Sequence, residues 1–394
     1  MTGLEALKLS GAMMPNPARH GRGAARPPSL SSHQGTLHLA CSHATGFRDA
    51  RASPGASSHP RPSHAHAPGR CRALAAAAAE PAPAPPLPSW QAGTAPHTWT
   101  WRGNKVSYLA TDAPGPAILL VHGFGACSAH WRACIPALAA RGFRVYALDL
   151  LGHGGSDKPP LAYTLELWRE QVADFLGQVV AGPAVLVGNS IGSLVSLMVA
   201  AQAGPAAPPV HGVALVNCAG GLNNKAVSED WRARAARPLF LLIDALLARR
   251  RVARWLFDKY RSPENIRSIL LKVYRDPASV DDELVQMLHA PSCQPGALEA
   301  FVSIMSGPPG PQPKHLVPDI GCPLLVFWGT ADPFTPLAGP VGRYFQALPS
   351  LRPGTRFVGV PGAGHCPHDE TPQAVLAELL PWLETVKATT QAVA

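Results

Sequence analysis

The sequence predicts an α/β fold in which a mostly parallel, eight-stranded sheet is covered by helices on both faces. From about residue 95, short apolar runs that suit buried strands alternate with longer stretches of helical period. Several of these runs end in glycine-containing turns that carry Ser, Asp or His. Ligands of such sheets bind beyond the carboxyl ends of the strands, so the sequence places a site at that edge.

The individual elements are expected in the following order. The chain opens with a hairpin whose strands cover 99–101 and 105–110, around Gly103-Asn104. Buried-strand runs and helical stretches then alternate: strand 117–121, helix 129–140, strand 144–148, helix 165–180, strand 184–188, helix 194–202 and strand 212–216. Strands over 323–328 and 357–360 and a helix over 372–385 close the fold.

About 100 residues interrupt this alternation before the strand at 323. Stretches of helical period at 238–257 and 277–288 predict a helical insertion over roughly 222–316. The core of the domain, residues 95–385, would then consist of residues 95–221 and 317–385.

Ser190 lies at the centre of a G-x-S-x-G motif between an expected strand and an expected helix. This context predicts a nucleophile elbow, which holds the serine in a strained turn. Gly188 and Gly192 supply the small neighbours that such a turn requires. The free N–H groups and the positive dipole end of the following helix would point at the reacting centre.

A second glycine-containing turn, residues 122–125, follows the strand over 117–121. An acyl-transfer enzyme needs two N–H donors for the oxyanion, and we expect them from Ile191 and Phe124. Gly123 and Gly125 would let the backbone approach the substrate oxygen. A plain strand-to-helix turn is the alternative, and Ser190 downstream favours the catalytic interpretation.

Asp332 and His365 follow the last two expected strands, which gives the chain order Ser190, Asp332, His365. A serine hydroxyl is a weak nucleophile, so an imidazole must take its proton. A carboxylate must in turn fix the tautomer of the imidazole and stabilise its cation. The order Ser, Asp, His is that of the α/β-hydrolase triad.

Other residues compete for these roles. His368 lies close enough in sequence to be the base instead. Asn217 follows a strand where some relatives carry an alternative acid, but an amide cannot serve as one. Asp149 is expected to be a structural turn residue, and His153 to be a loop histidine.

Three residues near His365 are expected to be structural. Asp369 and Glu370 would begin the final helix, where carboxylates favour the dipole. Cys366 would be a packing residue, because Ser190 already occupies the elbow. The eight cysteines show no C-x-x-C pair and no metal-ligand spacing, so we expect buried free thiols and no metal site.

With these motifs in place, residues 97–382 resemble the α/β-hydrolase superfamily. Within it, they resemble the chloroplast group that contains pheophytinase and chlorophyll dephytylase. The resemblance is carried by residues 99–103, 122–125, 130–132, 149–159, 188–192 and 363–370. Ser193 is a departure, since that group usually has a second glycine there. In this fold the long insertion is normally a helical cap over the active site.

Residues 1–79 differ in composition from the rest of the chain. They contain eight Arg and one Lys against two acids, which accounts for +7 of the total net charge of +9. An acid-poor, Arg- and Ser-rich segment without helical or strand period predicts an organellar transit peptide, and a disordered low-complexity tail is the alternative. The resemblance implies a chloroplast rather than a mitochondrion.

The remaining residues carry only about +2, which argues against a nucleic-acid-binding surface. No apolar run approaches the roughly 18 residues that a membrane-spanning helix needs. The segment 239–247 is strongly apolar and is followed by Arg249, Arg250, Arg251 and Arg254. This pattern is typical of a solvated basic helix end, or of peripheral contact with a membrane beside a lipophilic entrance.

Taken together, these features predict a serine hydrolase that cleaves a carboxylic ester through an acyl-enzyme, without a cofactor. The resemblance implies a lipophilic ester, such as a phytyl, pigment or lipid ester. Haloalkane dehalogenases and epoxide hydrolases use an aspartate nucleophile at the elbow, so Ser190 argues against both. A hydrolase-like ligand receptor and a triad C–C hydrolase or lyase remain open as alternatives.

Overall fold

The computed structural model describes residues 93–202, 209–223 and 237–393 of the 394-residue chain. The predicted transit peptide, residues 1–79, lies outside the described residues. The same holds for the side chains of residues 237–241, which include the start of the apolar segment.

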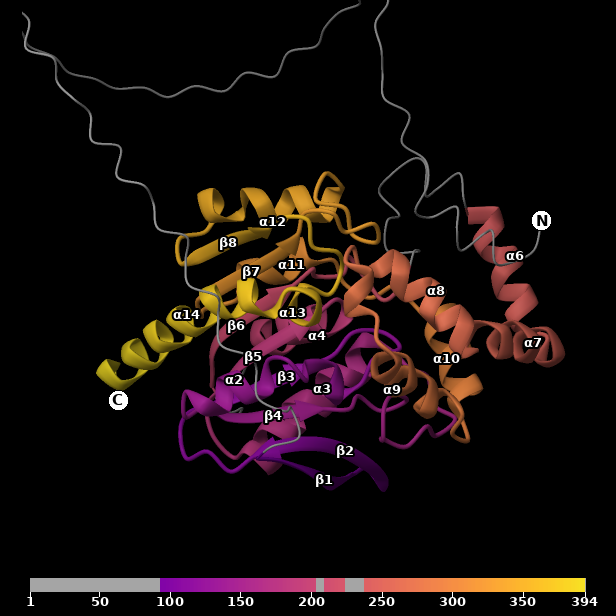
Figure 1. Ribbon diagram of the computed structural model, residues 1–394, viewed down its shortest axis with the longest axis horizontal. Helices are drawn as coiled ribbons and strands as arrows, with labels where there is room; N and C mark the ends of the chain where they lie inside the picture. The colour runs from indigo at the N-terminus through magenta and orange to yellow at the C-terminus, as the bar shows by residue number, and fades with distance from the viewer. Residues whose placement is uncertain (1–92, 203–208, 224–236, 394) are drawn as a thin grey trace, which may run out of the picture. The chain divides into compact units, whose positions relative to one another are not determined.

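An eight-stranded sheet carries the fold, in the order β1-β2-β4-β3-β5-β6-β7-β8 (Figure 1). The strands are β1 (Thr94–Trp101), β2 (Asn104–Thr111), β3 (Ala117–Val121), β4 (Arg144–Leu148), β5 (Ala184–Asn189), β6 (Val210–Val216), β7 (Leu324–Gly329) and β8 (Thr355–Val360). β1 and β2 form an antiparallel hairpin, β2 pairs antiparallel with β4, and all later pairs are parallel. The predicted mostly parallel sheet is therefore confirmed.

Helices follow the strands as a doubly covered sheet requires. Apart from α6 to α10, the helices are η1 (Ser128–Trp131), α2 (Ile135–Ala140), α3 (Leu165–Phe175), the π-helical turn η2 (Leu176–Val180), α4 (Ile191–Ala201), α11 (Pro313–Leu316), η5 (Val317–Asp319), α12 (Pro340–Leu351), α13 (Pro367–Glu370) and α14 (Pro372–Val393). Between β6 and β7 lie α6 (Arg237–Leu247), α7 (Arg250–Tyr260), α8 (Pro263–Val273), η4 (Pro277–Ser279), α9 (Asp282–Ser292) and α10 (Ala297–Ser306). The helices α6 to α10 gather at the right-hand side of Figure 1.

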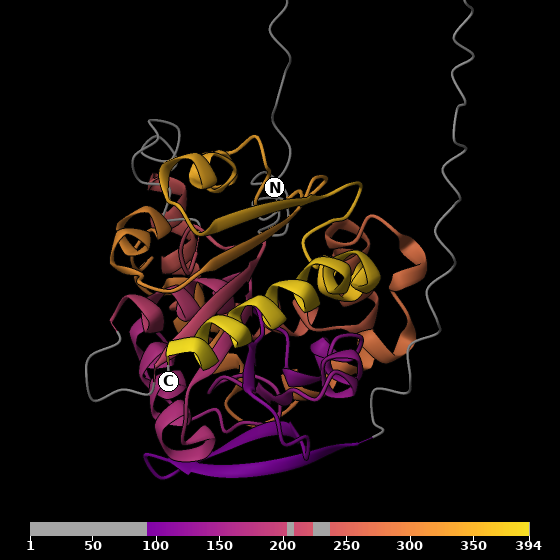
Figure 2. The ribbon, with the colours of Figure 1, turned by 90° about the vertical axis from the view of Figure 1, so that its left-hand side faces the viewer.

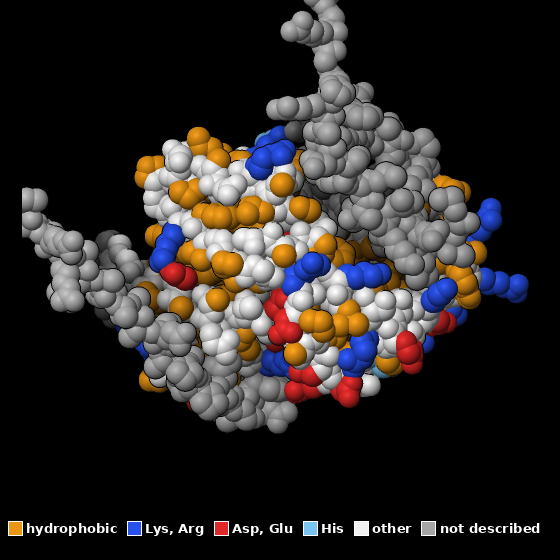
Figure 3. All heavy atoms as spheres, turned by 45° about the horizontal axis from the view of Figure 1, so that its top comes forward, with side chains coloured by type: hydrophobic (Ala, Val, Ile, Leu, Met, Phe, Trp, Pro, Cys, Tyr) orange, Lys and Arg blue, Asp and Glu red, His pale blue; other side chains and the backbone are white. Residues whose placement is uncertain are grey.

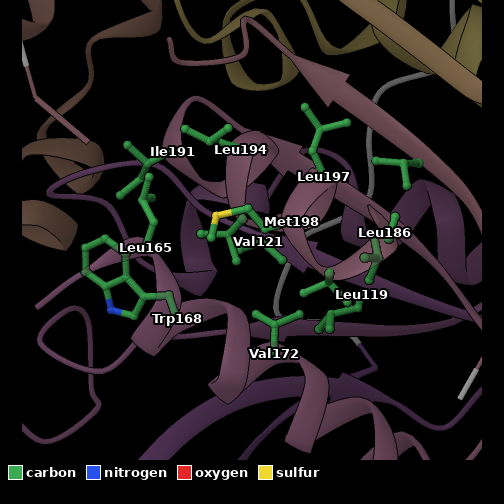
Figure 4. Packing of buried hydrophobic residues seen from close by; sticks show 14 of the residues in the cluster. Leu119, Val121, Leu165, Trp168, Val172, Leu186, Ile191, Leu194, Leu197 and Met198 are labelled. Atoms are coloured by element: carbon green, nitrogen blue, oxygen red, sulfur yellow. The ribbon is translucent and has the colours of Figure 1, made fainter. Parts of the chain in front are cut away.

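The two faces of the sheet bury two separate apolar cores. In β3, Leu119 and Val121 pack toward α3 and α4 (Figure 4), whereas Ile118 and Leu120 pack toward α2 and α14. Successive side chains of a strand point to opposite faces, so both faces demand apolar residues. Figure 2 shows α14 crossing the second of these faces.

The helices between β6 and β7 form two smaller apolar clusters. One joins α6, α7 and α10, with Leu247, Phe257 and Leu298 at its centre. The other joins α8 and α9, and it includes Cys366 from the loop after β8. The two clusters therefore pack largely within the insertion, and the second also packs on the core.

The structure corrects the predicted turn of the hairpin. Arg102 and Gly103, with φ of 50° and 76°, form the turn, and Asn104 already pairs with Trp101. A two-residue turn with two positive φ values matches the right-handed twist of the strands.

Several predicted helical stretches are divided, and 277–288 splits into η4 and α9. The stretch 129–140 splits into η1 and α2, because Pro136 in the first turn of α2 cannot continue a preceding helix. The stretch 238–257 splits at Arg249, whose backbone is extended, so that α6 and α7 both pack against α10.

The prediction that Asp369 and Glu370 begin the final helix is wrong. They lie in the separate short helix α13, and α14 starts at Pro372. Thr371, with φ of −135° and ψ of 58°, is not helical, because the residue before a proline disfavours the helical conformation. Both carboxylates are mostly buried.

Ser193, which stands where the pheophytinase group usually has a glycine, has a structural role in α4. Its hydroxyl donates to Gly188 O at 2.6 Å and accepts from Val216 N at 3.1 Å. The side chain is fully buried. It therefore connects the first turn of α4 to β5 and β6.

We expect Ser193→Ala to lower the free energy of unfolding by about 1–3 kcal/mol, because the buried hydroxyl loses its hydrogen bonds to both β5 and β6. Ser196→Ala is the matched control, since Ser196 is also fully buried in α4. The Ser196 hydroxyl makes a single hydrogen bond, to Gly192 O. That oxygen already accepts from a backbone N–H of the helix. Urea unfolding measures both variants, and an equal loss in the two would contradict the role of Ser193.

Candidate active site

Ser190 stands between β5 and α4 in a strained backbone conformation. Its φ of 54° and ψ of −118° are unusual for a residue with a side chain. Its N–H donates to Val216 O at 3.0 Å, and its side chain is half-buried. The strained turn holds the side chain at the carboxyl edge of the sheet, as a nucleophile elbow does.

The elbow is packed too closely for any side chain but hydrogen at two positions. A Cβ on Gly192 would lie 2.2 Å from Val121 O, and one on Gly188 would lie 2.4 Å from Gly192 O. These contacts are backbone to backbone, so they cannot relax by rotation of a side chain. The small residues expected from the G-x-S-x-G motif are therefore a packing requirement of this turn.

Asp332 and His365 are brought together by the loops after β7 and β8. His365 Nδ1 and Asp332 Oδ2 are 2.7 Å apart. Asp332 is an acceptor at both oxygens, so Nδ1 carries the proton and Nε2 is left as the basic nitrogen. Asp332 is almost fully buried, while His365 keeps some exposure.

Several further donors surround Asp332. Oδ1 accepts from the N–H groups of Phe334 and Thr335, and Oδ2 accepts from Asn217 Nδ2 at 2.6 Å and from the Thr335 hydroxyl. Burial alone would raise the pKa of Asp332. The charge of His365 and the hydrogen bonds from His365, Thr335 and Asn217 outweigh burial and hold that pKa well below its usual range.

Asn189, the neighbour of Ser190 in the chain, connects the elbow to the loop that carries His365. Asn189 Nδ2 donates to His365 O and to Val216 O, at 3.2 Å in each case. The described residues include no hydrogen bond between Ser190 and His365 themselves. Catalytic hydrogen bonds are often long before substrate binds, so a resting triad does not require this bond.

The loop after β3 carries Phe124 beside the elbow. A Cβ on Gly123 would lie 3.2 Å from Ser190 Cβ, and Gly125 has a φ of 69°. Ile191 is the first residue of α4, and the first N–H groups of a helix have no partner within the helix. Both expected oxyanion donors thus come from segments that adjoin Ser190.

His122 fixes the conformation of this loop. Its Nε2 accepts from Leu150 N at 3.0 Å, so its Nδ1 carries a proton and donates to Gly123 O at 2.7 Å. Burial is the main cause that lowers the pKa of His122, which therefore stays neutral. In the sequence, His122 stands out only as part of the motif 122–125.

Asp149 is a structural turn residue, as expected. Its carboxylate accepts from Ser128 N at 2.6 Å and from Gly155 N at 2.8 Å. His153 is buried and lies against the rings of His122, Phe124 and Trp168. Burial holds the pKa of His153 well below its usual value.

His368 does not take the place of His365. It is fully buried against Trp131 and His130, with ring centroids 4.2 and 4.8 Å away. Neither of its ring nitrogens has a hydrogen-bond partner among the described residues. Cys366 is buried as well, and burial raises the pKa of its thiol well above the usual value.

The described residues contain no group of three or more His, Cys, Asp or Glu placed to hold a metal ion. None of their helices is both long and apolar enough to cross a membrane. A hollow lined by Ala117, Val185 and Leu383 lies at the amino ends of β3 and β5. It is at the opposite edge of the sheet from Ser190 and is not part of this site.

A comparison with known protein families assigns the chain. The model of the alpha/beta hydrolase family matches residues 118–379, which include the elbow, Asp332 and His365. The match covers well over half of the chain. The protein therefore belongs to the alpha/beta hydrolase family.

The chain is also similar to individual proteins. Pheophytinase, chloroplastic, from Arabidopsis thaliana is 28% identical over 312 residues, which are 69% of this chain and 62% of that relative. The aligned part thus spans less than two thirds of the relative. The predicted resemblance to pheophytinase is confirmed.

Solved structures share the fold at low identity. A thermophilic esterase from Thermogutta terrifontis has a TM-score of 0.56 and 23% identity, covering 74% of this chain and 99% of the esterase. An epoxide hydrolase has a TM-score of 0.60 and 18% identity, covering 74% of this chain and 99% of its own. At these identities the comparisons establish the fold alone. The reaction must be inferred from the residues of the site.

The buried histidines make the stability of the fold depend on pH. Burial, with His130 and His365 nearby, lowers the pKa of His368 well below 6.5, its value in the unfolded chain. Below pH 6.5 the unfolded chain binds a proton that the folded chain does not. The free energy of unfolding should therefore fall with decreasing pH, by up to about 1.4 kcal/mol per pH unit for this group.

We expect His368→Phe to reduce this slope by up to that amount between about pH 6.5 and 5. Urea unfolding at several pH values measures the slope. Substitution of His97, which is exposed, is the control and should leave it unchanged. An unaltered slope in folded His368→Phe would contradict the prediction.

Proposed function

We propose that the protein is a serine hydrolase that cleaves a carboxylic ester through an acyl-enzyme. The observation that carries this proposal is the strained Ser190 at the carboxyl edge of the sheet, whose neighbour Asn189 bonds the backbone of His365, while Asp332 holds Nδ1 of that histidine. The hydrogen bond to Asp332 leaves His365 Nε2 as the basic nitrogen on the side of the ring away from the carboxylate. A base oriented in this way can activate a serine hydroxyl.

The reaction follows from these positions. Ser190 Oγ attacks the ester carbonyl while His365 Nε2 takes its proton, and Asp332 stabilises the imidazolium. The N–H groups of Phe124 and Ile191 stabilise the oxyanion, a contribution of about 2.7–4 kcal/mol for each donor in comparable sites. The imidazolium returns its proton to the leaving alcohol. Water, activated by His365, then releases the acid and restores the serine.

The helices α6 to α10 are proposed to act as a cap over this site, within the insertion predicted at 222–316. His365 N donates to Val273 O, at the end of α8, at 3.0 Å. On the other side, the ring of Phe301 in α10 lies 6.3 Å from that of Phe124. Helices α8 and α10 of the insertion therefore both contact loops that carry proposed catalytic groups.

A lipophilic substrate is supported by the aromatic residues near the site. Phe301 contacts Phe257 and Tyr260 as well as Phe124, and Phe334 contacts the ring of His365. Each buried CH₂ of a hydrocarbon chain contributes roughly 0.8 kcal/mol. Together with the pheophytinase relative, this favours an ester with a long hydrocarbon group, such as a phytyl, pigment or lipid ester.

Two other activities remain as alternatives. A hydrolase-like receptor would keep the same residues but release product far more slowly than a general esterase. A C–C hydrolase or lyase would use the same base without ester turnover. Rapid labelling of Ser190 by a fluorophosphonate, followed by steady ester hydrolysis, supports the esterase over both.

We further propose a reversible contact between α7 and an anionic membrane surface. Arg251, Arg254, Trp255 and Lys259 share an exposed face of α7, and Lys259 Nζ lies 5.6 Å from the Trp255 ring centre. In Figure 3, basic and hydrophobic side chains stand together at the right-hand edge of the molecule. Cationic groups beside an interfacial tryptophan suit a headgroup layer. Equal co-sedimentation with anionic and zwitterionic vesicles would contradict this contact.

The proposed location is the chloroplast, with a mitochondrion as the alternative. It rests on the composition of residues 1–79 and on the chloroplastic relative. Deletion of residues 1–79 should abolish import into isolated chloroplasts while ester hydrolysis persists. Import of the protein that lacks residues 1–79 would contradict the assignment of the transit peptide.

Asp332→Asn should retain the shape of the site but favour the wrong imidazole tautomer, with a loss of kcat of roughly 10⁴-fold as in the template triad. Ser190→Ala should abolish both hydrolysis and fluorophosphonate labelling. Asp149→Asn is a control for general damage, because Asp149 holds a turn and does not contact His365. Near-normal kcat in folded Asp332→Asn would contradict the assignment of the acid.

The rate with p-nitrophenyl esters should rise with the length of the acyl chain if the acyl group lies against the cap. Phe301→Ala should then raise KM for a long-chain ester about tenfold, equivalent to about 1.4 kcal/mol, and change KM for acetate much less. Leu351→Ala, at an exposed site on α12, is the control. A preference for acetate, with no hydrolysis of pigment or lipid esters, would defeat the lipophilic substrate and leave the hydrolase assignment intact.

A further inference from the structure

The loop that carries His365 is bound to the cap by its backbone. His365 N donates to Val273 O at 3.0 Å, and Val273 is the last residue of α8. A Cβ on Gly364 would lie only 2.0 Å from the same carbonyl oxygen. The histidine loop and the end of α8 are thus in direct contact, with no room for a side chain between them.

One carboxylate holds this contact together. Glu370 Oε2 accepts from Gly364 N at 2.6 Å, while its Oε1 accepts from Arg275 N at 2.5 Å and from Asp276 N at 2.8 Å. One oxygen therefore binds the residue before His365, and the other binds the chain just after α8. Glu370 itself is 8% exposed, so solvent cannot easily replace these three donors.

His365 is consequently held from two directions. Its N–H is bonded to the cap, and its carbonyl oxygen accepts from Asn189 Nδ2, next to Ser190. A displacement of the segment Val273–Asp276 would pull on the backbone of His365 while Asn189 holds the other side. Misplacement of a catalytic group by about 1 Å can reduce a rate by about 100-fold.

We propose that Glu370 is a positioning residue that couples the placement of the cap to the orientation of His365. Through Glu370, the chain after α8 and the histidine loop move as one unit, so that the cap must be seated for the imidazole to face Ser190. This proposal rests on the proposed function of His365 as the base. This role requires a carboxylate, because both oxygens of Glu370 accept hydrogen bonds. An amide has only one oxygen and cannot accept from donors at both ends.

The test compares Glu370→Gln with Asp369→Asn in the full chain. Asp369 is an equally buried neighbour in α13, and it accepts from the Tyr274 hydroxyl and Arg132 but not from the histidine loop. It therefore controls for loss of a buried carboxylate that anchors the cap. We expect kcat for a short p-nitrophenyl ester to fall about 10- to 100-fold in Glu370→Gln, with KM changed less than about threefold. In Asp369→Asn we expect kcat within about threefold of wild type, even if its Tm falls as far.

A second readout does not depend on ester turnover. We expect the Nδ1–H proton of His365, bonded to Asp332, to give a low-field proton NMR resonance that Asp332→Asn removes. We expect this resonance to shift or broaden in Glu370→Gln and to persist unchanged in Asp369→Asn. If the protein hydrolyses no ester at all, the proposed function fails, whereas the resonance still decides the role of Glu370.

Arg275→Pro is the second variant, to be measured in the same way if Glu370→Gln does not fold. Tyr274 already has the extended backbone that a residue before proline requires, with φ of −90° and ψ of 143°. The substitution removes one donor to Glu370 and keeps the carboxylate, so the same changes should occur to a smaller extent. An unchanged resonance and unchanged kcat in whichever of these variants is folded would overturn the proposal. The same is true if Asp369→Asn reproduces every change.

Discussion

The close approach of the elbow to β3 is the constraint on which the rest of the site depends. Because Gly188 and Gly192 bring backbone against backbone, Ser190 can hold a positive φ at the edge of the sheet. That conformation costs on the order of 1–3 kcal/mol and persists only where its surroundings determine it. The bonds from Ser190 N to Val216 O and through Ser193 to β6 provide such surroundings.

Buried carboxylates then arrange the loops around the elbow. Asp149 binds N–H groups of the turns after β3 and β4, Asp332 binds its own loop and His365, and Glu370 binds the histidine loop and the chain after α8. In each case a charged acceptor replaces water for several backbone donors at once, which makes strong hydrogen bonds in a buried setting. The candidate site is thus built from backbone segments that carboxylates hold in place, and these segments set the positions of Ser190 and His365.

The core of the fold was largely predictable from the sequence. β3 and β4 lie at the predicted residues, because a doubly covered parallel sheet imposes continuous apolar runs that are visible locally. Ser190, Asp332 and His365 could be selected because each follows such a run in a glycine-containing turn. The boundaries that failed involve proline or a change of direction, as at Pro136, where a local break divides an otherwise periodic stretch.

The sequence by itself determined the class of fold, the order of the strands along the chain and the residue types at the strand ends, since all three depend on patterns of neighbouring residues. Only the tertiary structure decided that Asn217 donates to Asp332, that Ser193 joins α4 to β6, and that Glu370 reaches the chain after α8. These pairs are separated by 115, 23 and 95 residues. No periodicity links such positions, because their distance is set by how the sheet, the loops and the insertion pack together.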